Sequence, residues 1–338
     1  MNFSGISIII CIYNGEYRIA PTLKALISQH IPENINVEIL LVDNGSTDKT
    51  IQVVREFWLT QQTNITLRII SEPKQGKANA LITGYNEAMY ELMLLCDDDN
   101  WLQPEYIKTV FEIYNEHPDI GLLGGYGKAF FEPDEKPKWF GKWERCYVCG
   151  KHHKKNGFLD DMDFRIWGAG SVMRKTLWAF LWSNGFTFYN SADEGKAMTE
   201  DAELSMAITF TGHRLYFDDS LWFIHDLHGG RITWENLIAQ QSLNGANSAI
   251  LYMYRLAYDH VSDAHPPVNW LFIRKILGLT WRIFKSFLKW DNYPERIFLY
   301  SIIRELLTNQ KKYKKLSLES FVWIAKVKET FPLKSWNA

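Results

Sequence analysis

Three consecutive carboxylates, Asp97, Asp98 and Asp99, have the residue types and spacing best suited to chemistry. They follow the apolar run 92–95, which is typical of a buried strand, and Pro104 soon afterwards suits the first turn of a helix. Open α/β sheets bind their ligands at such strand ends. Because adjacent like charges repel, the acids indicate a bound cation, and oxygen ligands favour Mg²⁺ or Mn²⁺. A solvated acidic turn is the plainer alternative.

The three acids have different expected roles. Alternate residues of an extended backbone share a face, so Asp99 is the better candidate for direct metal contact and Asp97 for a ribose or a metal-bound water. Asp98 is retained as a candidate for donor binding, although it can equally point elsewhere and serve structure. Lys77, at the start of a helix expected over 76–90, could offset diphosphate charge. The alternative is a solvated lysine in the first turn.

Polar residues also follow two earlier predicted strands. Tyr13 and Asn14 follow the strand expected over 6–12, and Asp43 follows the one expected over 37–42. A carboxylate at this edge can accept hydrogen bonds from a nucleobase or a ribose hydroxyl. Alternatively, Asp43 only caps the turn that follows it.

Two later segments carry further candidates. Gly168, Ala169 and Gly170 are small enough for a backbone to approach a ligand closely, or to pack closely in a strand. Glu200 and Asp201 begin a predicted helix, where capping and the helix dipole explain acidic residues. The same dipole predicts a lowered pKa for the Asp201 carboxyl.

Strands alternate with helices over the first 125 residues, which predicts a parallel sheet with right-handed crossovers. The expected strands are 6–12, 37–42, 65–70, 91–96 and 120–125, and the helices are 17–29, 76–90 and 104–116, with a further helix after residue 48. Two short strands are expected later, over 214–217 and 221–224. No G-x-G-x-x-G run follows the first strand and a P-loop is absent, so a nucleotide would be held in another way.

Composition sets broader bounds. The 338 residues suffice for one large domain or a catalytic domain with an appendage, and the net charge of −2 gives no overall reason to expect nucleic acid. Four scattered cysteines favour a reducing compartment. The N-terminus lacks the features of a signal peptide, and no window of about 18 residues is free of charge. We therefore expect a cytoplasmic protein without a membrane span.

Six motifs in order resemble family 2 glycosyltransferases of the bacterial surface-polysaccharide type, over about residues 5–230. They are Ile8-Ile9-Ile10-Cys11-Ile12-Tyr13-Asn14, Val42-Asp43-Asn44-Gly45-Ser46-Thr47-Asp48, Gly76-Lys77-Ala78-Asn79-Ala80, Asp97-Asp98-Asp99, Gly168-Ala169-Gly170 and Thr199-Glu200-Asp201. The resemblance implies a GT-A fold, a nucleotide-sugar donor, a divalent metal and inversion at the anomeric carbon. Two departures, Cys11 for proline and Asn100 for a fourth acid, fall where no metal contact is expected.

The resemblance also implies roles for single residues. Asp201 matches the catalytic base, with Glu200 beside it, and Asp43 matches an aspartate that contacts uracil. Residues 168–170 match a segment bordering donor sugar and acceptor. His225 occupies a position where several similar enzymes have a metal-contacting histidine, although a lone histidine is usually structural.

Cysteine and histidine residues raise a separate zinc hypothesis. Cys146 and Cys149 are followed by His152 and His153, which gives four ligands of the right kind. The gap between the cysteine and histidine pairs is short for a tetrahedral structural site. A loop that happens to hold two thiols is the alternative.

The segment 231–338 has helical patterns, and 270–290 resembles a basic amphipathic helix. Its apolar face comprises Ile273, Ile276, Leu277, Trp281, Phe284, Phe287 and Leu288, and its basic residues are Arg274, Lys275, Arg282, Lys285 and Lys289. No acid lies between Trp270 and Trp290. This pattern suits peripheral binding to an anionic membrane. The alternative is a helix packed on the catalytic domain with a solvated basic face.

These patterns predict a GT-A catalytic domain over 1–230, with a nucleotide-binding half (1–127) and an acceptor half (128–230), and a helical extension over 231–338. The GT-A sheet is expected to be mostly parallel and flanked by helices. The predicted enzyme is a metal-dependent, inverting hexosyl- or N-acetylhexosaminyltransferase using a nucleotide sugar, with UDP as the expected nucleotide. The acceptor is expected to be a glycan or a lipid-linked oligosaccharide.

Transfer of a single sugar is favoured because the Gln-x-x-Arg-Trp motif of processive members is absent from the sequence. Two alternatives remain. A sugar nucleotidyltransferase would need a Gly-rich basic loop after the first strand. A catalytically silent glycan-binding or scaffold subunit would not need the acids at 97, 99 and 201.

Overall fold

The chain forms two compact units, each described here by itself. The computed structural model describes residues 3–131, 136–159, 165–188, 199–227, 230–259, 268–287 and 292–330. A sheet unit comprises residues 1–209 and 213–229, and a helical unit comprises residues 210–212 and 230–338. The predicted division of the first unit at residues 127 and 128 into nucleotide and acceptor halves stays a prediction.

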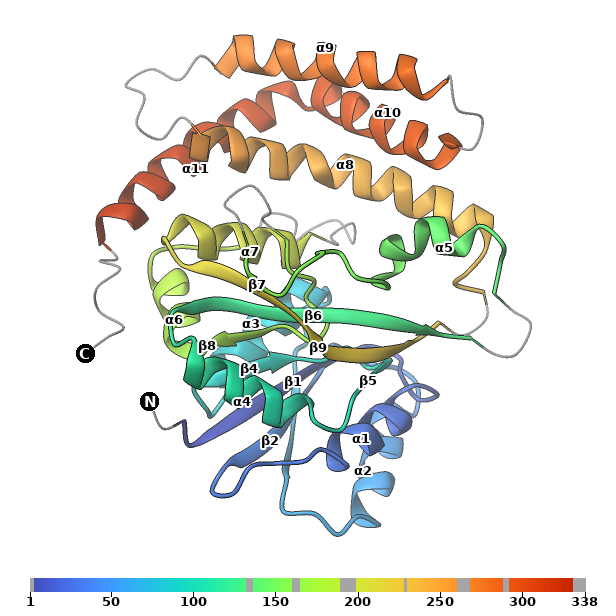
Figure 1. Cartoon of the computed structure of the whole chain (residues 1–338), viewed down its shortest axis with the longest axis vertical. Helices are drawn as coiled ribbons and strands as arrows, with labels where there is room; N and C mark the ends of the chain where they lie inside the picture. Colours follow the sequence, from blue (N-terminus) through green and yellow to red (C-terminus); the bar gives the residue numbers. More distant parts are fainter. Residues whose placement is uncertain are drawn as a thin grey trace. The chain divides into compact units, whose positions relative to one another are not determined.

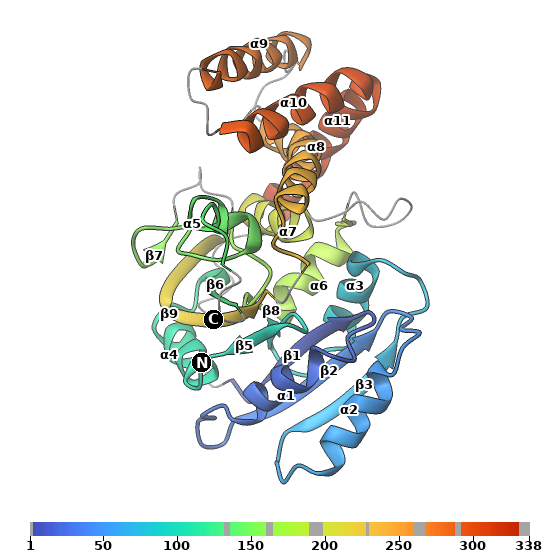
Figure 2. The same ribbon diagram turned by 90° about the vertical axis from the view of Figure 1, so that its right-hand side faces the viewer.

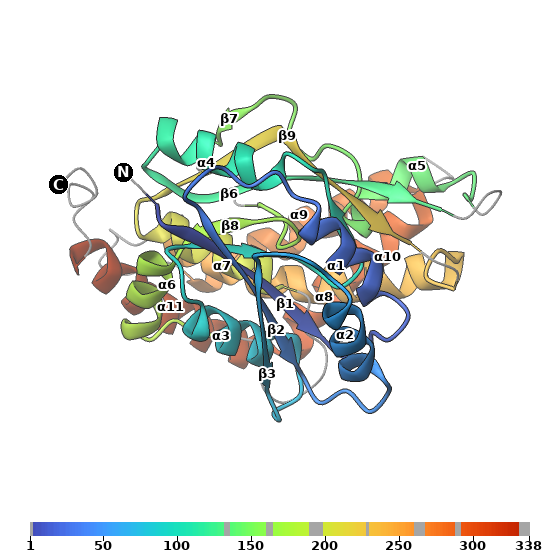
Figure 3. The same cartoon turned by 90° about the horizontal axis from the view of Figure 1, so that it is seen from below.

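The sheet unit contains one mixed sheet in the order β3-β2-β1-β4-β8-β6-β9-β5, with β7 paired to β9 (Figures 1 and 3). Its strands are β1 (Gly5–Ile12), β2 (Asn36–Asp43), β3 (Thr66–Ser71), β4 (Leu92–Leu95), β5 (Asn100–Leu102), β6 (Ile120–Phe130), β7 (Gly157–Phe158), β8 (Val172–Arg174) and β9 (Arg214–Asp226). The half from β3 to β4 is parallel, as expected from its alternating strands and helices. Beyond β4 the sheet becomes mixed, because β8 pairs antiparallel with both β4 and β6.

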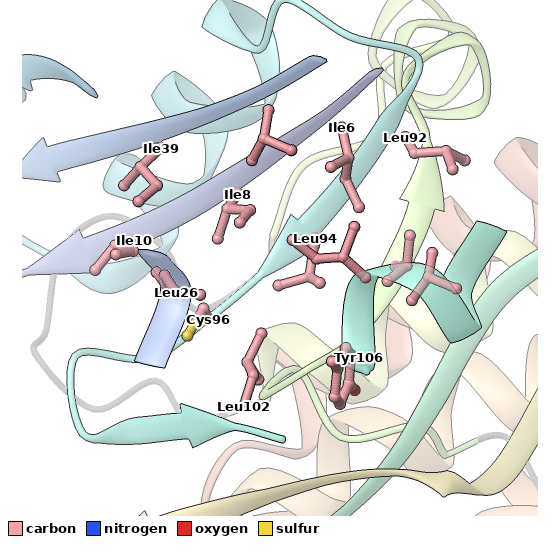
Figure 4. Close-up of a cluster of buried hydrophobic side chains, with 14 of the residues drawn as sticks. Ile6, Ile8, Ile10, Leu26, Ile39, Leu92, Leu94, Cys96, Leu102 and Tyr106 are labelled. Atoms are coloured by element: carbon pink, nitrogen blue, oxygen red, sulfur yellow. The ribbon is translucent and has the colours of Figure 1, made fainter. Parts of the chain in front are cut away.

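Helices cover both faces of this sheet: α1 (Ile19–Ile27), α2 (Thr50–Leu59), α3 (Lys77–Glu87), α4 (Tyr106–Glu116), α5 (Phe140–Trp143), α6 (Lys175–Ser183) and α7 (Glu200–Phe210). Ile6, Ile8 and Ile10 of β1 point into a core layer shared with α1 and α4 (Figure 4). On the other face, a Cβ added at Gly84 of α3 would lie 2.5 Å from Ile9 Cγ2. The near-continuous apolar run of β1 thus reflects burial on both faces.

The expectation of two short strands over 214–217 and 221–224 is wrong, because β9 is one strand of 13 residues. Its pairing with β6 shifts register between Gly124 and Tyr126, opposite the segment between Phe217 and Trp222. A Cβ added at Gly125 would lie 1.6 Å from the carbonyl oxygen of Leu221, so only glycine permits this close approach. The run of three polar residues in this irregular segment, Asp218, Asp219 and Ser220, is typical of a loop in the sequence.

The helical unit consists of α8 (Trp234–Asp259), α9 (Val268–Ser286), α10 (Tyr293–Thr308) and α11 (Gln310–Thr330). α10 packs against both α8 and α9, and α11 packs against α8 (Figures 1 and 2). Gly245 of α8 allows close packing, since an added Cβ would lie 2.2 Å from the carbonyl oxygen of Phe298 in α10. Among the helices of the described residues, none is long and apolar enough to cross a bilayer.

Candidate active site

The acidic run lies on the turn between β4 and β5. β5 pairs antiparallel with β9, and the register sets Asn100 opposite His225. Asp99 immediately precedes Asn100, and its Oδ2 lies 3.5 Å from His225 Nε2. Strand pairing therefore brings together two distant residues that the sequence predicts as metal ligands.

The tautomer of a neutral His225 follows from its other ring nitrogen. Nδ1 lies 2.8 Å from the carbonyl oxygen of Tyr147, and because a carbonyl oxygen only accepts, Nδ1 carries the proton. The lone pair of Nε2 then faces the carboxylate of Asp99, and both side chains are buried. A cation would relieve the repulsion between these two electron-pair donors. The Asp99–His225 pair therefore fits a divalent metal, with Tyr147 fixing the imidazole.

Lys77 begins α3 and connects two acids from distant parts of the chain. Its Nζ lies 3.0 Å from Asp97 Oδ1 and 3.6 Å from Glu200 Oε1. Burial acts to lower the pKa of Lys77, but the two carboxylates outweigh it and hold the pKa well above its ordinary value. The Lys77 side chain is still 42% exposed. A charged ammonium is thus available to an anionic ligand beside Asp97.

Glu200, the first residue of α7, is 8% exposed. Burial raises the pKa of its carboxyl, against the opposing effect of Lys77. Its Oε2 has no hydrogen-bond partner among the residues that the structure describes. A buried acceptor without a donor is costly, so a ligand hydroxyl bound beside Glu200 would satisfy this oxygen.

Asp201 lies against the small residues of the predicted ligand-bordering segment. A Cβ added at Gly168 would lie 3.4 Å from Asp201 Cβ, and Asp201 Oδ1 accepts the N–H of Ala202 at 2.7 Å. The expectation of a lowered pKa is wrong, because burial raises the pKa of Asp201 and the cation of Arg165 opposes this only in part. Desolvation of the Asp201 carboxyl therefore outweighs the opposing effects of Arg165, Lys77 and the neighbouring backbone N–H groups.

Asp98 points away from Asp97 and Asp99. Its Oδ2 accepts from the guanidinium of Arg18 in α1, with a distance of 2.7 Å to Nη2. Thr22 Oγ1 donates to the Asp98 carbonyl oxygen at 2.8 Å. The geometry therefore supports the structural alternative for Asp98 and gives no support to its predicted contact with the donor.

Residues predicted to bind a nucleoside form hydrogen bonds within and to the turn that follows β2. Asp43 Oδ1 accepts the N–H of Ser46 at 3.0 Å, so Asp43 does cap this turn. Asn14, which has a positive φ of 50°, accepts the N–H of Thr47 through Oδ1 at 2.8 Å. Tyr13 is 49% exposed. These contacts fix the β1 and β2 ends side by side, and nucleoside binding by Tyr13, Asn14 and Asp43 stays a prediction.

The segment Gly168-Ala169-Gly170 serves packing at its second glycine. Gly170 has a φ of 74°, and an added Cβ would lie 2.5 Å from the hydroxyl of Tyr106. That hydroxyl donates to the Gly170 carbonyl oxygen at 2.7 Å, and Gly170 N–H donates to the Leu95 carbonyl oxygen at 2.8 Å. Close packing therefore accounts for Gly170, while Gly168 borders Asp201.

The zinc hypothesis gains no support from the geometry. Among the described residues, no three His, Cys, Asp or Glu side chains gather as a metal site. The ring of His152 lies against Trp167, with centroids 4.1 Å apart, and burial lowers its pKa to about 3. His153 Nε2 donates to the carbonyl oxygen of Arg165 at 3.0 Å. Both histidines thus have roles in packing this segment.

Three contributors to the site were missed from the sequence: Arg18, Arg165 and the Tyr147 carbonyl. Each acts on an acid or histidine that is far away in the chain. Arg18 has a local signal, since it lies just after the loop that follows β1. Arg165 lies in an irregular segment, and Tyr147 ends a 3₁₀ helix of four residues, Glu144–Tyr147. Neither segment has a spacing pattern that carries information on distant contacts.

Comparisons with known proteins identify the family of this chain. A family model described as "Glycosyl transferase family 2" matches residues 7–177, half of the chain. Poly-beta-1,6-N-acetyl-D-glucosamine synthase of Staphylococcus epidermidis is 30% identical over 122 residues, which is 36% of this chain and 28% of that protein. Putative glycosyltransferase EpsH of Bacillus subtilis is 24% identical over 130 residues, 38% of this chain and 36% of that protein. The matched segment therefore spans about a third or less of these relatives.

Solved structures share the fold. The mannosyltransferase PcManGT from Pyrobaculum calidifontis, in complex with GDP-Man and Mn²⁺, has a TM-score of 0.54 and 13% identity, covering 98% of this chain and 88% of that one. TarS of S. aureus has a TM-score of 0.51 and 16% identity, covering 96% of this chain and 55% of that one. The predicted GT-A architecture, a central sheet flanked by helices with further C-terminal helices, is confirmed.

Proposed function

The chain belongs to glycosyl transferase family 2, and on that premise we propose that it transfers one sugar from a nucleotide-sugar donor to an acceptor hydroxyl. The observation that carries this proposal is the grouping of Lys77, Asp97 and Glu200 by ion pairs, with Asp201 next to Glu200. UDP is the nucleotide we propose, in line with a TarS structure described as a complex with UDP-GlcNAc.

We propose that Asp99 and His225 hold a divalent metal, Mn²⁺ or Mg²⁺, with Asp97 nearer the ribose or a metal-bound water. In the described part of the chain no third ligand completes this pair, so donor phosphates and water would supply the remaining positions. When bound, such an ion acts as a Lewis acid on the diphosphate of the leaving nucleotide. Lys77 would add a second positive charge beside the same diphosphate.

Asp201 is the general base in this proposal. Its carboxylate takes the proton from the acceptor hydroxyl as that oxygen attacks the anomeric carbon from the face opposite the leaving nucleotide, which inverts the configuration. Glu200, held by Lys77, offers its second oxygen to a hydroxyl of the bound sugar. Partial desolvation of Asp201 raises the proton affinity of its carboxylate, so it is a stronger base than a fully solvated aspartate.

We propose a glycan or a lipid-linked oligosaccharide as acceptor, and peripheral contact with an anionic membrane through residues 270–290. The acceptor class is supported by the names of two relatives, a poly-beta-1,6-N-acetyl-D-glucosamine synthase and a poly(ribitol-phosphate) beta-N-acetylglucosaminyltransferase. The charge and exposure of α9 support the membrane contact. Residues 288–290 lie outside the described residues, so the contacts of Leu288 and Lys289 add nothing here.

The decisive experiment incubates the purified full-length protein with Mn²⁺, a panel of nucleotide sugars and acceptor glycans, and measures nucleoside diphosphate release. We expect UDP release with at least one donor, and its loss in Asp201→Asn. Asp219→Asn, an exposed acid paired with Lys151, is the matched control and should keep full activity. Release of pyrophosphate would instead indicate a nucleotidyltransferase. Donor binding without turnover under all conditions would favour a silent binding subunit.

A further inference from the structure

A pocket of about 330 Å³ lies between α8 and α9 of the helical unit. This α9 pocket is lined by Tyr252, Arg274, Lys275, Gly278, Leu279 and Arg282. Its volume falls at the lower end of the roughly 300–1,000 Å³ of small-molecule sites, which suits a compact polar group. Three of its six wall residues carry a positive charge.

Two of these cations contact aromatic rings. Lys275 Nζ lies 4.3 Å from the ring centroid of Tyr252, and the guanidinium of Arg274 lies 5.4 Å from that of Trp270. Neither has an ion-pair partner within the ranges that the structure describes. The third cation, Arg282, has the carboxylate of Glu295 at 3.7 Å.

The pocket therefore holds more positive than negative charge. One further acid lies near, Asp259, which influences Tyr252 but is ion-paired with Arg255 at 2.8 Å. Burial, followed by the neighbouring charge of Arg282, lowers the pKa of Lys275. An anion bound among the three cations would offset the repulsion among them. It would also accept hydrogen bonds from their N–H groups.

Beside the pocket, α9 exposes large apolar side chains instead of burying them. These residues, here called the apolar stripe, are 55–65% exposed: Trp270, Ile273, Leu277, Trp281 and Phe284. Spacings of three and four residues place them on one side of the helix. Among the α9 side chains that the structure describes, the buried apolar ones are instead Phe272 and Leu279. A contiguous exposed apolar strip with a cationic flank marks an interaction surface.

We infer that the α9 pocket binds the phosphate of an anionic membrane lipid while the apolar stripe enters the headgroup layer of the same membrane. At 100° per residue, Arg274, Arg282 and Lys285 all follow one flank of the stripe. Lys285 Nζ lies 5.2 Å from the ring of Trp281, which itself stacks on Phe284. Aromatic rings beside basic side chains suit the interface between lipid headgroups and acyl chains.

A second copy of the chain is the less favourable occupant of this surface. An antiparallel pair of α9 helices would bring the two cationic flanks together, and like charges oppose that contact. No acidic residue of α9 is available to compensate, since residues 268–287 contain none. The inference rests on the proposed membrane contact but not on the proposed sugar transfer.

The test compares sedimentation of the full-length protein with vesicles of phosphatidylglycerol in phosphatidylcholine and with vesicles of phosphatidylcholine alone. The triple variant Arg274→Gln, Lys275→Gln, Arg282→Gln should bind the anionic vesicles on the order of a hundredfold more weakly, since each cation near an anionic surface contributes roughly fivefold. The matched control Arg304→Gln, Lys311→Gln, Lys315→Gln removes three exposed cations from α10 and α11 and should change binding by about twofold or less.

Equal weakening by both triple variants would overturn the pocket, because general charge attraction would then explain binding. Absence of sedimentation by the parent protein would overturn the membrane contact as well. If inorganic phosphate raises the melting temperature of the parent but not of the pocket variant, and vesicles bind neither, the pocket serves a soluble phosphate. Nucleotide binding, measured by calorimetry in parallel, should be unchanged and reports on the fold and the donor site separately.

A second pair of variants tests the apolar stripe. Trp281→Ala with Phe284→Ala removes two exposed rings and should weaken vesicle binding tenfold or more, because membrane affinity scales with the apolar area that the helix buries in the bilayer. Leu318→Ala with Val322→Ala, which are 53% and 70% exposed on α11, is the control and should have no effect on it. Light scattering should show the same mass for the parent and the stripe variant. A halving of mass in the stripe variant, with vesicle binding unchanged, would identify a second copy as the occupant.

Discussion

Both units gather side chains of like charge, but they balance that charge differently. The carboxylates around Lys77 in the sheet unit have cationic partners within the fold, whereas the cations of the α9 pocket in the helical unit mostly lack anionic partners among the described residues. In the sheet unit, Asp97 and Glu200 share the ammonium of Lys77, and Asp99 faces His225. In the helical unit, Arg274 and Lys275 contact aromatic rings. The first group holds negative charge partly balanced within the fold, and the second holds positive charge with little balance.

The two regions bring their charged side chains together by different structural means. The acidic site depends on strand pairing, since the β5–β9 register sets Asp99 beside His225. The cations of the α9 pocket come from one helix, which presents them to Tyr252 of its neighbour. A buried site of the first kind resists screening by salt, while an exposed surface of the second kind does not.

The largest expected effect is at Asp201. Asp201→Asn keeps the size of the side chain but cannot take a proton, so we expect turnover to fall by roughly 10²–10⁴-fold, the usual contribution of a general base. Nucleotide-sugar affinity should barely change, and vesicle binding should not change at all. Glu200→Gln should be milder. Steady-state kinetics and calorimetry on both variants provide the check, and normal turnover in Asp201→Asn with a dead Glu200→Gln would exchange the two roles.

The next effect distinguishes adjacent acids. Asp99→Asn should weaken Mn²⁺-dependent UDP binding by about 10–100-fold, at least the loss caused by removing a partner around a metal. Asp98→Asn should leave that binding nearly intact and instead lower stability by about 1–2 kcal/mol, because its charged contact is to Arg18. Calorimetry with and without Mn²⁺, together with thermal unfolding, measures both. Unchanged UDP affinity in Asp99→Asn would contradict the metal assignment.

Added salt should weaken vesicle binding by the helical unit more than UDP binding by the sheet unit, with a smaller effect than the substitutions above. Raising ionic strength from about 0.05 M to about 0.5 M shortens the screening length several-fold, so vesicle binding by the parent should fall at least tenfold. Binding of UDP with Mn²⁺ should fall by no more than a few-fold, because Asp99 and His225 are buried. Parallel sedimentation and calorimetry series give the comparison. Equal salt sensitivity in both would mean that the donor site is far more exposed than the structure shows.

Sequence patterns predicted most of the parallel half of the sheet, because buried parallel strands and their crossover helices leave local signals. The same patterns placed Asp97, Asp99, Lys77 and Glu200 at strand ends or helix starts, which is where they lie. The continuous strand β9 was missed because a register shift inside a strand has no local signature. The sheet was expected to be mostly parallel, but the antiparallel position of β8 depends on tertiary pairing and could not be read from the sequence.

Contacts between distant residues were the least predictable part of the site. The ion pair with Arg18 turns Asp98 away from the two adjacent acids. The spacing of residues in the sequence does not predict which of the three acids forms this pair. The pKa of Asp201 was predicted with the wrong sign, since the dipole of a helix start is visible in the sequence and burial is not. In α9, spacing identified the amphipathic pattern, but packing determined that Phe272 and Leu279 are buried and Leu277 is exposed.

The smallest expected effect concerns the pH dependence of the proposed base. Burial raises the pKa of Asp201 above its ordinary value, and Arg165 lowers it. Only the ionised form can take a proton, so activity should rise as pH increases through this raised pKa. Arg165→Gln removes the lowering influence and should therefore move the acidic limb of the kcat profile to higher pH, with the plateau above it unchanged. A limb that stays in place would show that Arg165 does not act on Asp201.

The same shift predicts an effect on stability with a definite sign. A raised folded-state pKa means that protonated Asp201 favours the native state below the unfolded value, and this contribution is lost as pH rises through the folded pKa. Above the folded-state pKa, the ionised and partly desolvated carboxylate therefore costs stability. Asp201→Asn should unfold at an equal or higher temperature than the parent at pH 7, although it loses activity. A clear fall in its melting temperature would show that Asp201 stabilises α7 and would reassign the loss of turnover to structure.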